Sequence, residues 1–217
     1  MGTIESVNVG TATPSEHTGP GITGIAKRPV PGRIAVTAPG PRGSGGSGLA
    51  GDAVCDLRFH GGDDKAVYAY AAEDLRYWAG ELDPPPGPGT FGENLTTAGL
   101  DLTGALIGQR WQVGGELVLE VSGPRIPCRT FAAAIGVPRW VRTFMAARRP
   151  GTYLRVITPG TVAAGDPVRS VHTPDHEVTI TLAFRALTTE RSLLPRLLPA
   201  GIALPTELRT PASTANW

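Results

Sequence analysis

Glycine and proline interrupt this chain so often that it does not suit a fold built from long helices. The 217 residues include 29 glycines and 21 prolines. Between them lie short runs of alternating apolar and polar residues, such as 3–9 and 33–37, and this alternation is typical of half-buried strands. Many short strands joined by tight turns accommodate such a composition. We therefore predict a mainly β protein.

Further strands follow in the second half of the chain. Residues 110–113 and 116–121 flank Gly114-Gly115, and a two-residue glycine turn between alternating runs predicts a hairpin. Two more strands are expected at 153–157 and 178–184. The sequence thus indicates short strands in both halves of the chain.

Helical spacing of apolar residues predicts two short amphipathic helices, near residues 70–82 and over 140–145. Proline-containing segments follow both. Residues 38–48 are rich in glycine, serine and proline and have nothing to bury, which is typical of a mobile surface loop. Such a loop can serve as a plain linker or as a lid.

The character of the chain changes near residue 185. A helix broken by Pro195 is expected over 187–198, and residues 205–217 are polar and proline-bearing enough to be loosely held. We therefore divide the chain into a main domain, residues 1–184, and a C-terminal extension, residues 185–217, that is partly helical or loosely ordered.

Charge and hydropathy bear on the partners. Twenty basic and nineteen acidic residues leave a formal charge of +1, which gives no reason to expect nucleic acid or an anionic membrane as a partner. The N-terminus lacks the features of a signal peptide, and no apolar run approaches the ~20 residues of a membrane span. We expect a cytoplasmic protein, in which both cysteines are free thiols.

Cys128 is the first candidate for a functional side chain. It follows a predicted strand, with two prolines stiffening the approach and an arginine on either side, Arg125 and Arg129. A guanidinium near sulfur favours the thiolate, and a strand end that cannot become helical holds the side chain within reach of a ligand. The alternative is an inert, half-buried thiol, because free cysteine is among the most buried side chains.

Three further segments, residues 60–66, 91–96 and 151–156, bring glycine and charged residues together. Paired glycines after His60 let a ligand approach the backbone, and Lys65 adds a positive charge that suits a phosphate or another anion. This segment is therefore a candidate anion site. A tight turn with a solvated lysine is the alternative.

Together with Cys128, these segments resemble the MOSC family, the domain found at the C-terminal end of molybdenum-cofactor sulfurases and as free-standing bacterial proteins of the YiiM type. The resemblance covers roughly residues 3–183 in the family's order. The matching motifs are Lys27-Arg28-Pro29-Val30, Gly48-Leu49-Ala50-Gly51-Asp52, His60-Gly61-Gly62, Lys65-Ala66-Val67, Phe91-Gly92-Glu93-Asn94-Leu95, Pro124-Arg125, Pro127-Cys128, Tyr153-Leu154-Arg155-Val156 and Gly165-Asp166.

The resemblance implies a β-barrel fold with a few short helices, in which the cysteine faces a cavity for the molybdenum cofactor (molybdopterin). Cys128 becomes the catalytic residue, as molybdenum ligand or persulfide carrier. The other matched positions become cofactor-binding residues: Lys27, Arg33, His60, Lys65, Glu93, Asn94, Arg125 and Arg155. Structural alternatives are that His60 caps a turn, that Glu93 and Asn94 order backbone amides, and that Arg155 pairs with Asp52 or Asp166. The family is also associated with pyridoxal phosphate, for which this sequence offers no site.

Three features depart from the family pattern. Thr152 stands where an aromatic residue usually precedes Tyr153, and we expect it to widen or repolarise the cavity. Cys55 is not a family residue and is either a bystander or a resolving thiol for an oxidised Cys128. The prolines after residue 185 argue against the compact helical extension of related proteins.

The resemblance implies an oxidoreductase that reduces N-hydroxylated bases or amines, with electrons from a separate donor protein because this chain has no flavin or iron–sulfur motif. One alternative is a sulfurtransferase that carries a persulfide on Cys128 and receives sulfur from a donor protein. Another is a non-catalytic cofactor carrier. A small-molecule substrate is expected in the first two cases, and a homodimer is compatible with all three.

Overall fold

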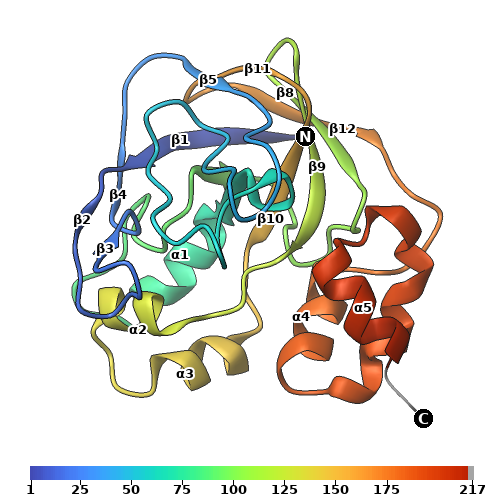
Figure 1. The fold of residues 1–217 in the computed structure, drawn as a ribbon. Coiled ribbons are helices and arrows are strands. Elements are labelled where there is room, and N and C mark those ends of the chain that lie inside the picture. The colour runs from blue at the N-terminus through green and yellow to red at the C-terminus, as the bar shows by residue number, and fades with distance from the viewer. Residues whose placement is uncertain (215–217) are drawn as a thin grey trace.

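Seven strands close into a barrel in the computed structural model, which describes residues 1–214 (Figure 1). Around the barrel the order is β12, β8, β9, β10, β6, β7 and β1, and β1 pairs with β12 to complete the ring. The predicted β-barrel is thus confirmed. The strands are β1 (Gly2–Gly10), β6 (Val67–Ala71), β7 (Leu95–Ala98), β8 (Arg110–Val113), β9 (Leu117–Pro124), β10 (Thr152–Thr158) and β12 (Pro167–His172).

Neighbouring strands of the barrel are antiparallel, except that β6 and β7 are parallel. A parallel pair needs a crossover connection, and α1 (Ala72–Ala79) lies in that connection. An eighth strand, β4 (Lys27–Pro29), pairs with the far end of β1. The short ribbons β2 (Thr13–Pro14) with β3 (Ile22–Thr23), and β5 (Ile34–Val36) with β11 (Gly160–Val162), flank the barrel.

The barrel interior forms one apolar cluster, and aromatic rings form a second cluster between the barrel and its helices. Side chains of β1 alternate in burial from Gly2 to Ser6, but Ser6, Val7 and Asn8 are all buried after a register shift. Ile4 and Val7 join the interior cluster. The second cluster consists of Tyr68, Tyr70, Leu75, Trp78, Phe91, Phe131, Trp140, Phe144 and Phe184. It lies beneath α1, α2 (Arg129–Ile135) and α3 (Trp140–Ala147).

The predicted hairpin is present, but its turn is one residue longer than expected. Val113 of β8 pairs with Leu117 of β9, so Gly114, Gly115 and Glu116 form the turn. Gly114 has φ +59°, a left-handed conformation that glycine adopts without strain. The strands expected at 33–37 and 153–157 correspond to β5 and β10.

The strand predicted over 178–184 is wrong, because residues 180–188 form the helix α4 (Ile180–Thr188). Threonine alternates with apolar residues at its start, which imitates a strand. The side chain of Thr179 accepts a hydrogen bond from the backbone of Leu182 at 3.0 Å and so caps the helix. Ile180, Ala183 and Phe184 are buried at helical spacing.

Both predicted helices exist with shorter or shifted bounds. Tyr70 and Ala71 belong to β6, so the helix expected over 70–82 is limited to α1, and the second is α3. The sequence did not predict α2, which begins directly after Cys128 and ends at Gly136, where φ is +73°.

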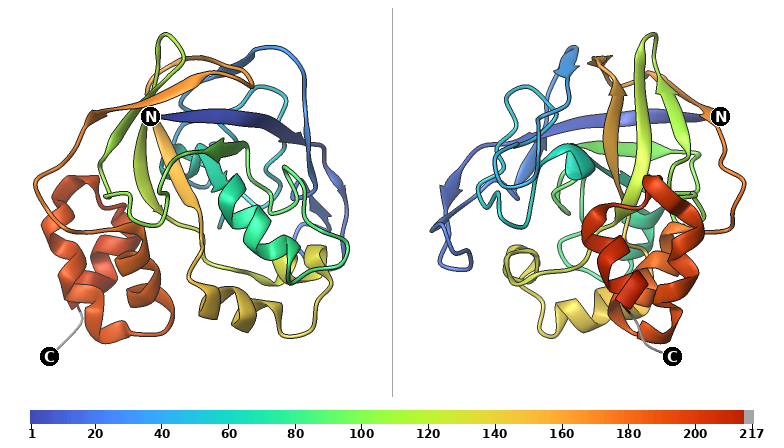
Figure 2. Two further views of the ribbon diagram at one scale, coloured as in Figure 1. Left: turned by 180° about the vertical axis from the view of Figure 1, so that it is seen from behind. Right: turned by 45° about the vertical axis from the view of Figure 1, so that its right-hand side comes forward.

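A C-terminal helical unit lies beside the barrel, as Figures 1 and 2 show from several sides. It consists of α4, the 3₁₀ segment η2 (Arg191–Ala203) and α5 (Thr206–Thr214). Leu194, Leu197 and Leu204 are buried in it. The expected domain boundary at residue 184 falls inside α4. Residues 206–214, for which the sequence favoured a loose end, form α5, and residues 215–217 lie outside the described residues.

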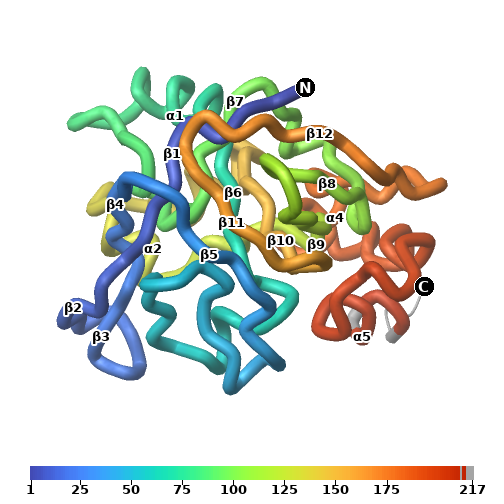
Figure 3. Tube along the Cα trace, turned by 90° about the horizontal axis from the view of Figure 1, so that it is seen from above, coloured from blue at the N-terminus to red at the C-terminus, as the bar shows by residue number. Residues whose placement is uncertain are grey.

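The glycine-rich loop 38–48 packs against the segment that contains His60 and Lys65. The backbone amide of Gly62 donates to the carbonyl of Gly46 at 3.1 Å, and that of Gly48 donates to Ala66 at 2.7 Å. Seen from above, the loops between β4 and β6 gather on one side of the barrel and the C-terminal unit on another (Figure 3). No helix within residues 1–214 is long and apolar enough to cross a bilayer.

Candidate functional site

Cys128 lies where two cavities meet. The chain leaves β9 at Pro124, runs through an irregular segment and enters α2, whose N-cap residue is Cys128. An inner cavity of about 740 Å³ and an outer cavity of about 1090 Å³, both including their open mouths, share Cys128, His60, Lys65 and Tyr153 in their walls. Cys128 therefore forms part of the wall of both cavities.

The surroundings of Cys128 favour its ionised form. Burial acts to raise the pKa of the thiol, but a hydrogen bond from His60, the charge of Arg125 and the backbone amide of Phe131 outweigh it and lower the pKa to about 6. The side chain is consequently a thiolate at neutral pH, which is the nucleophilic and metal-binding form of cysteine.

Arg125 places a buried positive charge beside this sulfur. Its side chain is only 6% exposed and donates a hydrogen bond of 2.5 Å to the carbonyl of Phe91. The guanidinium also lies 4.2 Å from the ring centroid of Phe131 and 5.1 Å from that of Tyr68. Within residues 1–214, no carboxylate forms an ion pair with it. The thiolate and any anion bound in the inner cavity are thus its natural counterions.

Lys27, Asp52 and Asn94 form a hydrogen-bonded group in the wall of the inner cavity. Lys27 pairs with Asp52, which also accepts hydrogen bonds from Asn94 at 2.9 Å and from the backbone amide of Gly10 at 2.7 Å. Burial lowers the pKa of Lys27, although Asp52 acts to raise it. Asp52 therefore positions both predicted binding residues.

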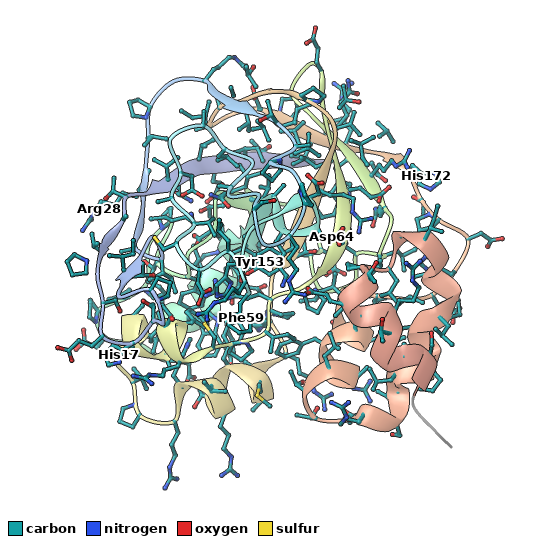
Figure 4. The ribbon with its side chains drawn as sticks, viewed as in Figure 1. His17, Arg28, Phe59, Asp64, Tyr153 and His172 are labelled. Atoms are coloured by element: carbon teal, nitrogen blue, oxygen red, sulfur yellow. The ribbon has the colours of Figure 1, made fainter. Side chains whose placement is uncertain are left out.

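Lys65 lies in the walls of both cavities. It is the last residue of η1 (Asp63–Lys65), and its ammonium group donates a hydrogen bond to the carbonyl of Phe59 at 3.0 Å. Its ammonium group also pairs at 2.8 Å with Glu207, a residue of α5. In Figure 4, the labelled side chains of Phe59 and Tyr153, which both line the outer cavity, lie near one another in the middle of the view.

Three predicted cofactor-binding residues do not line either cavity, which corrects the sequence-based expectation. Arg33 is on the outside and pairs with Asp166 through bonds of 3.0 and 2.7 Å. Arg155 pairs with Asp64 at 2.6 Å and with Glu120 at 2.7 Å. Asp166 holds Arg33 on the outside, and Arg155 lies behind Asp64, which lines the outer cavity.

Glu93, the third of these residues, orders the turn before β7. It is fully buried and accepts hydrogen bonds from the amides of Gly89 at 2.6 Å and Phe91 at 3.0 Å, and from Thr96 at 3.1 Å. Burial raises its pKa to about 7 despite these bonds. The backbone-ordering alternative therefore describes Glu93, and the ordered turn places Asn94 at the cavity.

Several wall residues were not predicted. Tyr68 and Tyr153 contribute aromatic surface, 5.1 Å apart between ring centroids; Tyr153 belongs to the matched motif 153–156, but neither tyrosine was predicted as a site residue. Cys55 also lines the inner cavity, where burial raises the pKa of its thiol. Thr152 lines neither cavity, because its hydroxyl donates to the carbonyl of Gly123 at 3.3 Å.

Both cysteines are free, as expected. Within the described part of the chain, no three histidine, cysteine or acidic side chains gather as a metal site. The inner cavity instead offers one thiolate and a set of cations, with amide and hydroxyl groups between them. Such walls suit an anionic group that carries its own metal ligands.

The comparisons with known proteins agree with this geometry. The protein YflK of Bacillus subtilis is 36% identical over 163 residues, which cover 75% of this chain and 70% of that protein. A protein named "Reductase" from Gibberella moniliformis is 30% identical over 138 residues, which cover 62% of this chain but only 24% of the reductase. The crystal structure of YiiM from Geobacillus stearothermophilus superposes with a TM-score of 0.77 at 26% identity, covering 98% of both chains. The sequence profile of the MOSC domain matches residues 56–169. This chain therefore belongs to the MOSC domain family.

Proposed function

We propose that this protein is a molybdenum-cofactor-dependent reductase in which Cys128 is the protein's ligand to molybdenum. The observation that carries the proposal is the position of Cys128 at the junction of two cavities, beside the buried Arg125, which forms no ion pair with a carboxylate of residues 1–214. A soft thiolate suits a metal whose other ligands are sulfur and oxygen.

The residues of the inner cavity fit the cofactor. Arg125 and Lys27 would hold its anionic groups, and Asn94 and His60 would hydrogen-bond to the pterin or to the ligands around the metal. Lys65 would become available to a phosphate if Glu207 moved away. When bound, the cofactor supplies an acceptor for one oxygen atom and the means to pass on two electrons.

The reaction is the reduction of an N-hydroxylated base or amine: R–NHOH + 2 e⁻ + 2 H⁺ → R–NH₂ + H₂O. The protein's own contribution is to keep Cys128 ionised, to bind the cofactor in the inner cavity and to leave the outer cavity open for the substrate. Phe59 and Ile126, which line the outer cavity, are 58% and 41% exposed. They offer apolar surface that a flat organic substrate would cover.

The name of the Gibberella relative supports a reductase, but that match covers a quarter of the relative. Sulfur transfer is the second candidate, and one observation favours it. Cys55 lines the same inner cavity as Cys128, so a persulfide on Cys128 would have a second thiol within the same chamber. A pure cofactor carrier would not need the outer cavity.

The test is to purify the protein from a host that makes the cofactor and to measure molybdenum, pterin, intact mass and turnover. We expect one molybdenum per chain and reduction of N-hydroxylated bases with a reduced viologen dye. Cys128→Ala should lose both metal and turnover while keeping its fold, whereas Cys55→Ala should keep both. Full molybdenum content and turnover in Cys128→Ala would refute the proposal, and a stable gain of one sulfur atom on Cys128 without molybdenum would favour sulfur transfer.

A further inference from the structure

Residues 121–165 contain no acidic residue but carry seven arginines, although the whole chain has a formal charge of only +1. They are Arg125, Arg129, Arg139, Arg142, Arg148, Arg149 and Arg155. The site uses Arg125, and the acids of the barrel neutralise Arg155. Most of the others remain to be explained.

Arg139 and Arg142 line a groove between α3 and α1. The groove has a volume of about 900 Å³ including its open side, and its other walls are Tyr77, Thr143, Ala146 and Ala147. Both arginines are exposed, and neither forms an ion pair with another residue of the described chain. The groove is thus positively charged, with apolar surface at its floor.

Two further arginines extend this positive charge. The guanidinium of Arg149 lies 4.4 Å from the ring centroid of Tyr77, and Arg148 follows α3 as its C-cap. These two are partly balanced, by Asp74 at 2.5 Å and by Glu190 at 3.4 Å. The net charge of the face therefore comes from Arg139 and Arg142.

The local fold does not explain why Arg139 is an arginine. It has φ +61°, a left-handed conformation that disfavours residues with a side chain and that glycine or asparagine would adopt more easily. It also lies at the N-terminus of α3, where the helix dipole disfavours a positive charge. A residue that is unfavourable in both respects indicates a role outside the folding of α3.

Packed aromatic rings connect this groove to the site. The ring of Tyr77 lies 5.0 Å from that of Trp78, Trp78 lies 4.8 Å from Trp140, and Trp140 lies 5.6 Å from Phe131. The guanidinium of Arg125, beside Cys128, lies against Phe131. A continuous path of packed side chains therefore leads from the groove to the neighbourhood of the sulfur.

We propose that this groove is the docking site for a small acidic electron-transfer protein that reduces the enzyme. This inference rests on the proposed function, which needs two electrons per turnover from a separate donor. The donor gives up its electrons one at a time and is itself oxidised, and the two electrons with two protons convert R–NHOH to R–NH₂ and water. Acidic groups on the donor would face Arg139 and Arg142, and its apolar surface would cover Tyr77.

The test uses two acidic carriers as probes, a flavodoxin and a plant-type ferredoxin, and measures their binding to the full-length protein at low and high ionic strength. We expect at least one carrier to bind and the binding to weaken as salt rises. Arg139→Glu/Arg142→Glu should weaken it about tenfold. Arg142→Glu alone should also weaken carrier binding. It changes an exposed position within α3 and leaves Arg139, with its left-handed backbone, unchanged. The matched control is Arg169→Glu on β12, which lies at the opposite end of the molecule from α3 (Figures 1 and 2).

Turnover separates this inference from the function on which it rests. The charge-reversal variants should lose turnover with the reduced carrier but keep it with the reduced viologen dye, which needs no docking site. Binding of neither carrier, binding that salt does not weaken, or equal weakening by Arg169→Glu would overturn the docking site. Failure of the wild-type protein to turn over with the dye would instead overturn the proposed function. Carrier binding is measured without turnover, so the two failures are distinguishable.

Discussion

Glu207 of the C-terminal helix α5 forms an ion pair of 2.8 Å with Lys65, which lies in the walls of both cavities around Cys128. Glu207 also pairs with Arg42 of the glycine-rich loop. One carboxylate thus joins the C-terminal helical unit, the loop and the rim of the site. Glu207 also pairs with Lys65, the residue for which the sequence predicts a bound anion.

Glu207→Gln should therefore free Lys65 for a bound anion. We expect the apparent affinity for inorganic phosphate, measured by calorimetry, to rise, because a neutral amide no longer competes for the ammonium group. The melting temperature should change little, since a partly exposed ion pair contributes about 0–1 kcal/mol. Glu116→Gln, at the exposed turn between β8 and β9, is the matched control. Unchanged or weaker phosphate binding in Glu207→Gln would show that Glu207 does not compete at Lys65.

The two thiols should titrate far apart. In Cys55→Ala, alkylation of Cys128 by iodoacetamide should show a midpoint at a pH of about 6, whereas in Cys128→Ala the thiol of Cys55 should react only above its ordinary range, because burial raises its pKa. Removing the hydrogen bond with His60→Ala should move the Cys128 midpoint upward. Coincident midpoints for the two thiols would contradict this.

The same titration has a consequence for stability. The pKa of Cys128 is lower in the folded protein, at about 6, than its ordinary value of 9.0. Its contribution to the free energy of unfolding should therefore be complete above about pH 9 and should disappear as the pH falls through about 6. Urea unfolding of the wild type and of Cys128→Ala, repeated at several pH values between about 6 and 9, measures this contribution to the free energy of unfolding.

Arg125 and Arg33 allow a direct test of which predicted cation belongs to the site. Arg125→Gln should raise the pKa of Cys128 and reduce cofactor retention, because it removes the positive charge beside the sulfur. Arg33→Gln should leave both unchanged and cost less than about 1 kcal/mol, because the side chain is 55% exposed and its ion pair with Asp166 lies on the outside of the barrel. Loss of cofactor from Arg33→Gln would restore Arg33 as a cofactor-binding residue.

Phe184 tests whether the C-terminal unit folds together with the barrel. It is fully buried on α4, and its ring lies 6.3 Å from that of Phe144 on α3. Phe184→Ala should lower the free energy of unfolding by about 3–5 kcal/mol in a single transition. Leu198→Ala, at a residue that is 41% exposed in η2, should change it by less than about 0.5 kcal/mol. A separate early transition in Phe184→Ala would mean that the two parts unfold independently.

Much of the fold was predictable because alternation reports directly on half-buried strands. The same signal failed over residues 180–188, where threonines at the start of α4 imitate a strand while Thr179 caps a helix. It also could not reveal that β1 and β12 pair to close the barrel, because ring closure depends on strand order and tilt rather than on local pattern.

The candidate site was predictable where a motif combined a distinctive residue with a turn. Cys128, His60, Lys65, Lys27, Asn94 and Arg125 all line the inner cavity. Arg155 belongs to an equally distinctive motif, and Arg33 opens a predicted strand. Arg155 pairs with Asp64 and Glu120 and Arg33 with Asp166, and a single sequence does not show which acids come near which arginines. Tyr68 was missed because it lies just outside the Lys65-Ala66-Val67 motif, and no strand was predicted over residues 67–71.

The outer cavity has walls of two origins, the barrel and the C-terminal helices, which contribute Leu187, Pro205, Glu207 and Leu208. Chimeras that exchange residues 180–214 between homologues would alter this wall of the outer cavity and the ion pair of Glu207 with Lys65, while leaving Cys128 and Arg125 in place. The C-terminal helices can therefore reshape the approach to the sulfur without any change in the barrel.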